Sequence, residues 1–67
     1  MFIELTGVGG NKFIINLNLV ETINLGDDLT YVYINNLSNP LKVKESYEQV
    51  KELIKNEVAA ERGYWYE

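Results

Sequence analysis

The stretch Leu41-Lys42-Val43-Lys44-Glu45-Ser46-Tyr47-Glu48-Gln49-Val50 decides the fold, because the chain changes here from a strand to a helix. A short final strand is expected over residues 41–44, directly after the turn residues that end at Pro40. Ser46 is followed three residues later by Gln49, so the serine oxygen can accept a hydrogen bond from a helix amide while the glutamine side chain reaches back to the cap. A helix is therefore predicted to begin at Ser46.

The helix, expected over about residues 46–61, carries one apolar stripe. Its apolar side chains recur at three-to-four spacing, and they are Tyr47, Val50, Leu53, Ile54 and Val58. Charged residues occupy much of the remainder, so we expect the stripe to cover a sheet. Gly63 suits a helix C-terminal cap, and residues 63–67 form a short aromatic tail.

The residues before the helix predict antiparallel strands separated by turns. Alternating apolar and polar residues are typical of half-buried strands, and clusters of Gly, Asn, Asp and Pro are typical of the turns between them. The expected strands cover about residues 2–6, 12–17, 20–25, 29–35 and 41–44. The predicted fold class is therefore α+β, a small bent antiparallel sheet of four to five strands packed by one C-terminal helix.

The alternation also assigns side chains to faces of the strands. The expected groupings are Met1, Ile3 and Leu5; Phe13, Ile15 and Leu17; and Val20, Thr22 and Asn24 opposite Glu21, Ile23 and Leu25. Asn16 and Asn18 bracket a kink, because their side chains compete for nearby backbone groups. Five strands bent at this point could wrap round into a barrel, whereas four would stay open under the helix. We expect a strongly bent sheet.

Length and composition exclude several classes of protein. The chain has 67 residues, which leaves room for one core, so residues 1–67 are expected to form a single domain. It has neither cysteine nor histidine, which removes disulfides and the usual ligands of zinc, haem and iron-sulfur clusters, and we expect no metal and no cofactor. No apolar run approaches the length of a membrane span, and the N-terminus reads as a first strand and not as a signal peptide. The expected compartment is the cytoplasm.

Catalytic chemistry is not indicated by any motif. Gly7-Val8-Gly9-Gly10-Asn11-Lys12 superficially resembles a phosphate loop, but a strand follows it where a phosphate loop opens a helix. Asp27 and Asp28 lack the ligand spacing of a calcium loop and read as a solvated turn. A chain of this size also has little interior in which to shift the pKa of a catalytic group. The sequence therefore predicts a protein that is not an enzyme.

The aromatic residues are the candidate contact positions. Tyr64, Trp65 and Tyr66 place three rings in four residues, and such rings must fold back on the core, meet another chain or stay exposed. Tyr and Trp are common among interface hot spots, which makes this tail a candidate partner-binding segment. Tyr31 and Tyr33 share one strand face and could stack on a ligand, although ordinary sheet packing needs the same alternation.

Parts of the chain resemble a known family. Asn11-Lys12-Phe13-Ile14-Ile15-Asn16, Leu19-Val20-Glu21-Thr22-Ile23 and Val43-Lys44-Glu45-Ser46-Tyr47-Glu48-Gln49-Val50 are similar to the FlbD family, also called SwrD, of small flagellar and swarming-motility proteins. The resemblance covers roughly residues 2–55 and implies an accessory protein rather than a reaction. Short proteins of this pattern also occur in phage and mobile-element settings, which is the second context the resemblance implies.

A second resemblance, to the carbon storage regulator CsrA, implies RNA binding. The pattern of strand, Asn-x-Pro-type turn, short strand and helix over Asn35 to Val50 is similar to that protein, but Thr6-Gly7 and Lys44-Glu45 stand where its basic reading residues would be. An RNA-binding regulator would use Tyr31 and Tyr33 with the lysines Lys42, Lys44, Lys51 and Lys55. The net charge of -4 opposes this, because nucleic acid attracts the opposite sign.

The sequence therefore supports two hypotheses. The first is a small non-enzymatic protein-interaction or accessory module of FlbD-like type that forms a homo-oligomer, since so short a chain gains stability from a second copy. The alternative is a CsrA-like post-transcriptional regulator whose affinity for RNA falls steeply with salt.

Overall fold

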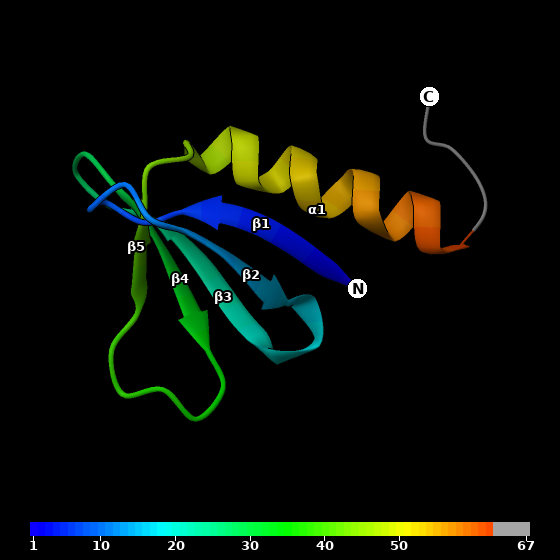
Figure 1. The fold of residues 1–67 in the computed structure, drawn as a ribbon, viewed down its shortest axis with the longest axis horizontal. Coiled ribbons are helices and arrows are strands. Elements are labelled where there is room, and N and C mark those ends of the chain that lie inside the picture. Colours follow the sequence, from blue (N-terminus) through cyan, green and yellow to red (C-terminus); the bar gives the residue numbers. More distant parts are fainter. Residues whose placement is uncertain (63–67) are drawn as a thin grey trace.

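Five strands and one helix form in the order that the sequence predicts (Figure 1). The computed structural model describes residues 1–62, and Gly63, the predicted helix cap, lies outside this range. The elements are β1 (Phe2–Thr6), β2 (Lys12–Asn16), the 3-10 helix η1 (Leu17–Leu19), β3 (Val20–Leu25), β4 (Thr30–Ile34), β5 (Leu41–Val43) and α1 (Tyr47–Arg62). The predicted α+β class is confirmed.

The bend in the sheet is sharp enough to divide the strands between two small antiparallel sheets. One contains β1 and β2, and the other has the order β3-β4-β5. An isolated bridge between Gly7 and Val43 connects them, and beside it the Lys44 amide donates to the Thr6 carbonyl oxygen at 2.8 Å. Away from this junction β1 and β5 diverge, so the two sheets enclose an angle (Figure 1).

The expected kink after β2 is a turn of 3-10 helix. The Asn16 side chain accepts a hydrogen bond from the Asn18 amide at 2.9 Å, the local competition that the two asparagines predict. The Leu17 amide donates to the Met1 carbonyl oxygen at 2.9 Å, which holds the end of β2 against the start of β1. The chain then enters β3 in a new direction and the second sheet begins.

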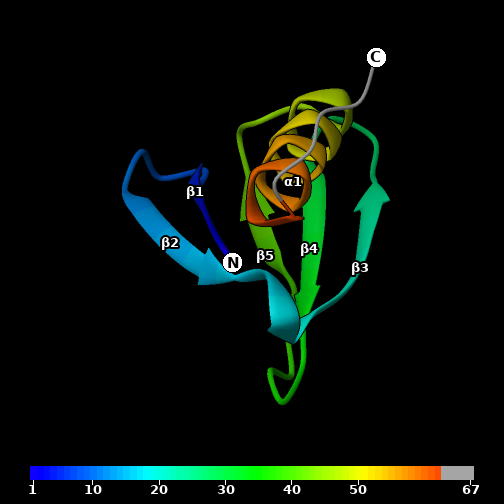
Figure 2. The ribbon, with the colours of Figure 1, turned by 90° about the vertical axis from the view of Figure 1, so that its right-hand side faces the viewer.

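The core lies inside the angle between the sheets and is sealed by the helix. Its buried cluster takes residues from both sheets and the helix, and it consists of Ile3, Leu5, Ile15, Val32, Val43 and Val50. Figure 2 shows α1 nearly end on, with β1 on one side of it and β3 on the other, and the helix contacts both strands. The apolar stripe of the helix therefore covers the sheets, as predicted, although Leu53 lies at the exposed edge of the stripe.

One face assignment is wrong, because β3 contains a bulge. Strict alternation places Val20 and Ile23 on opposite faces, yet both pack against the core. The register between β3 and β4 shifts between Val20 and Thr22, which inserts one extra residue and reverses the alternation beyond it. A single-sequence pattern of six residues carries no sign of such an insertion.

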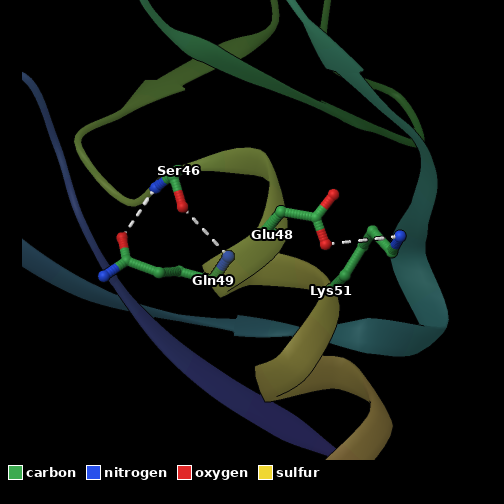
Figure 3. A network of polar contacts seen from close by, with 4 residues as sticks. All are labelled: Ser46, Glu48, Gln49 and Lys51. Carbon is green, nitrogen blue, oxygen red and sulfur yellow. Dashed lines mark hydrogen bonds and ion pairs between the residues drawn. The ribbon is translucent and has the colours of Figure 1, made fainter.

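The helix begins with the reciprocal cap that the sequence predicts (Figure 3). The Gln49 amide donates to Ser46 Oγ at 3.1 Å, and the Ser46 amide donates to Gln49 Oε1 at 2.8 Å. Two amides at the start of the helix are thereby satisfied, which is the capping-box arrangement. Glu48 and Lys51 form an ion pair at 3.5 Å on the exposed side of the first turn.

Glu45 joins the end of β1 to the segment that precedes the helix. Its carboxylate accepts a hydrogen bond from the Thr6 amide at 2.9 Å, next to the junction of the two sheets. Desolvation by burial raises the pKa of Glu45, but the hydrogen bonds from Thr6, the backbone of Glu45 itself and the charge of Lys12 together outweigh it. The pKa of Glu45 therefore lies below its ordinary value of 4.5.

Replacing Glu45 by alanine is expected to lower the free energy of unfolding by about 1–2 kcal/mol, because the charge-assisted bond to Thr6 is lost. Because the pKa of Glu45 is lower in the folded state than in the unfolded state, its ionised carboxylate stabilises the fold at pH values above the unfolded-state pKa. This stabilisation is lost as the pH falls below about 4.5 toward the folded-state pKa. Urea unfolding between pH 7 and pH 3 measures it. Glu45→Gln keeps an acceptor for Thr6 but cannot titrate, so its stability should fall less on acidification. An identical pH dependence in Glu45→Gln and the native chain would contradict this assignment.

Candidate protein-interaction surface

An apolar groove of about 330 Å³ opens where several parts of the fold converge. The β1–β2 hairpin forms one wall, and η1 lies beside it. The end of β4, the start of β5 and the loop that connects them complete the lining. The lining residues are Phe2, Ile14, Ile15, Asn16, Leu19, Ile34, Leu37 and Leu41. Asn16 is the only polar side chain among them. We call this feature the apolar groove.

Half of the exposed large apolar side chains of residues 1–62 line this groove. They are Phe2, Ile14, Leu19 and Leu37, with 58%, 68%, 44% and 53% of their surface exposed. A side chain of this size presents roughly 150–250 Å² when fully accessible, so together they leave on the order of 400 Å² of apolar surface in contact with water. The largest apolar patch of an ordinary monomer has about this size and is often functional, so the groove is a candidate interaction site.

Strand geometry places Phe2 and Ile14 on the outer surface. Ile3 and Ile15 are directly paired across β1 and β2, and both point into the core. Successive side chains of a strand point to opposite faces, so Phe2 and Ile14 must point outward. In this register Phe2 lies opposite Asn16 and diagonal to Ile14, which is close enough for the two apolar side chains to share one surface.

Two turns place the other groove residues. The Asn35 amide donates to the Leu19 carbonyl oxygen at 2.7 Å, which ties η1 to the end of β4. Asn36 then adopts a positive φ of 72°, a backbone conformation that asparagine tolerates better than most residues. The Leu37 amide donates to the Ile34 carbonyl oxygen at 3.2 Å and closes this turn. Leu37 is thereby held beside the groove.

Tyr31 and Tyr33 lie away from the apolar groove. Their neighbours in β4, Thr30 and Val32, are buried, so the two tyrosines occupy the outer face of the second sheet. Tyr31 packs over Gly26, where an added Cβ would collide with its ring. Tyr31 therefore makes a packing contact of the kind that the alternation allows, while Tyr33 is 37% exposed and lines neither of the hollows described here. A contact of either tyrosine with a partner stays a prediction.

The tail residues Tyr64, Trp65 and Tyr66 lie outside the described residues, so their contact role stays a prediction. The apolar groove was not predicted, although the sequence contains a signal for it. Phe13-Ile14-Ile15 puts an apolar residue between two core residues, where strict alternation requires a polar one. Phe2 before Ile3 shows the same departure.

The lysines considered for RNA binding are interleaved with acidic side chains. A second hollow of about 470 Å³ lies along α1, and Glu48, Lys51, Glu52, Ile54 and Lys55 line it. Lys51 is paired with Glu48, and its ammonium lies 5.5 Å from the centre of the Tyr47 ring. This surface carries both signs of charge, whereas a site for a phosphate backbone concentrates positive charge.

No cluster of three acidic, histidine or cysteine residues that could hold a metal ion occurs within residues 1–62. In the same part of the chain, no helix has the length and apolar character needed to cross a membrane. The described surface is thus marked chiefly by the apolar groove.

Comparison with known proteins gives no assignment. No family model, no curated protein and no solved structure matches this chain.

Proposed function

We propose that this chain is a small non-enzymatic protein-interaction module that binds a segment of another protein chain in the apolar groove. The observation that carries the proposal is the gathering of Phe2, Ile14, Leu19 and Leu37 around one hollow. Binding there removes apolar surface from water, which is the main favourable contribution in protein association. The near absence of polar groups in the lining fits a protein contact better than a site for chemistry on a small substrate.

The sequence resemblance to the FlbD family suggests the setting of this activity. It supports an accessory role in flagellar or swarming motility, or a related role in a phage or mobile element, within the cytoplasm. The segment 43–50, which carries part of that resemblance, forms the end of β5, the Glu45 contact and the helix cap. These residues maintain the fold that presents the groove.

Leu37→Lys is expected to abolish capture of the partner protein while the fold remains intact. Leu37 lines the apolar groove from the loop between β4 and β5, and it is 53% exposed, so the substitution places a charge in the groove without burying it in the core. The measurement is a pull-down with the tagged full chain from lysate of the native host, with and without nuclease, analysed by mass spectrometry and RNA sequencing. We expect a nuclease-resistant protein that is recovered with the native chain and lost with Leu37→Lys.

Leu25→Lys is the matched control, because Leu25 is 69% exposed and lies outside the groove. It should retain the captured protein. Equal capture by Leu37→Lys and the native chain would remove the groove from the proposal. Enrichment of RNA that is lost on nuclease treatment would overturn the proposal in favour of the RNA-binding regulator.

A further inference from the structure

The outer edge of β2 is open for pairing with another strand. Within residues 1–62, β2 pairs with β1 alone. Just beyond the two ends of this ladder, the Leu17 amide donates to the Met1 carbonyl oxygen and the Gly7 amide donates to the Asn11 carbonyl oxygen. Hydrogen-bonded pairs alternate along an antiparallel ladder, so the odd-numbered residues of β1 and β2 bond to each other. The amides and carbonyls of Lys12, Ile14 and Asn16 therefore point away from β1.

An independent contact supports this assignment of direction. Thr6, an even-numbered residue of β1, donates its amide to Glu45 and accepts a bond from the Lys44 amide. Its backbone groups thus face away from β2, as the same pattern requires. By this parity the even-numbered residues of β2 present their backbone groups to the free edge.

The other outer edges are less suited to strand addition. Those of β1 and β5 are joined to each other at the Gly7–Val43 bridge and by the hydrogen bond from Lys44 to Thr6, and that of β3 is interrupted. The interruption in β3 is its bulge, and a bulge twists an edge strand out of alignment with a partner. β2 has an uninterrupted register over its five residues and carries one charged side chain, Lys12. The edge of β2 is thus the one suited to strand addition.

We propose that two copies of this chain pair antiparallel through their β2 edges, about a two-fold axis at Ile14. This inference rests on the proposed function, because both take the wall of the apolar groove as a contact surface. At the β2 edge of that wall, the contact is with a second copy of the chain. Ile14 then faces Ile14 of the other copy, and Lys12 faces Asn16. About six backbone hydrogen bonds form between the copies.

The side chains favour this arrangement. The antiparallel register sets lysine against asparagine, so no like charges are opposed. Ile14 and Asn16 belong both to the paired edge and to the groove wall, so the two grooves adjoin across the axis. The paired edges bury Ile14 and the backbone of β2, so the contact is at the small end of protein interfaces, below roughly 1,200 Å² in total. The expected affinity is in about the micromolar range.

Ile14→Lys is expected to weaken the dimer at least about 100-fold, because two ammonium groups would meet across the axis. Sedimentation equilibrium of the full chain over a range of concentrations measures the dissociation constant. Leu25→Lys adds the same charge at a position of nearly equal exposure and should dimerise like the native chain. Circular dichroism spectra of both variants should match that of the native chain.

A single cysteine tests the position of the axis, since the native chain has none. Directly opposed residues in a hydrogen-bonded antiparallel pair lie about 5.5 Å apart at Cα, a separation that a disulfide spans. Ile14→Cys should therefore oxidise to a covalent dimer at micromolar protein, and Leu25→Cys should not. A monomeric native chain at millimolar concentration, or equal oxidation of both variants, would overturn the inference. If Leu37→Lys still loses a captured host protein in that case, the proposed function stands without the dimer.

Discussion

Leu5→Ala is expected to lower the free energy of unfolding by about 3 kcal/mol, within the roughly 2–5 kcal/mol that such core truncations cost. Leu5 is fully buried in β1, where the two sheets and the helix meet. Removing its branched end deletes apolar contacts and leaves a cavity. The surrounding side chains come from several strands and the helix, so they cannot all move inward to fill it. A domain of this length has a total stability of roughly 3–10 kcal/mol, so the loss is a large part of it. Urea unfolding followed by circular dichroism measures the change.

Phe2→Ala is the control, because it removes a larger side chain from the same strand. Phe2 is 58% exposed and points outward into the apolar groove, so its truncation should cost less than about 1 kcal/mol. The same variant should weaken partner capture, which Leu5→Ala affects only through unfolding. If Phe2→Ala destabilised the fold as much as Leu5→Ala, the groove would be part of the core rather than a binding surface.

Local patterns in the sequence predict the elements well. The strand over 2–6 and the strand over 20–25 match β1 and β3 in their bounds, and the pair Ser46 and Gln49 identifies the helix start. These features depend on residues close together in the chain, such as a period of two or a cap with its partner three residues away. The kink at Asn16 belongs to the same class, because its side chain bonds only two residues ahead.

Features that depend on distant parts of the chain could not be predicted in this way. The two sheets are separate because β1 and β5 meet only at the bridge between Gly7 and Val43 and the hydrogen bonds beside it, and the Glu45 contact joins residues 39 positions apart. The apolar groove combines residues from β1, β2, η1, β4, β5 and the loop between β4 and β5, so its existence depends on how the sheets diverge. Tyrosine and tryptophan indicate a contact surface by their type, whereas the groove is built from Ile14 and other residues that usually indicate a core.

Val50→Asp is expected to lower the free energy of unfolding by more than about 4 kcal/mol, which would leave the chain largely unfolded. Val50 is fully buried and is the helix residue of the core cluster. An aspartate there loses the burial of the valine and places an unpaired carboxylate among apolar side chains, which costs about 3–5 kcal/mol by itself. A helix of 16 residues is marginal in water without packing, so helical circular dichroism should fall together with the sheet structure.

Leu53→Asp introduces the same charge one turn further along α1, at a side chain that is 37% exposed. Its carboxylate can reach water, so the free energy of unfolding should fall by about 1 kcal/mol and the chain should stay folded. The contrast between the two variants measures the role of the helix in closing the angle between the sheets. Helix propensity cannot produce it, because Leu53→Asp loses more propensity than Val50→Asp. Equal stability of Val50→Asp and Leu53→Asp would mean that the two sheets hold together without the helix, and the groove could then be studied in a chain that ends before α1.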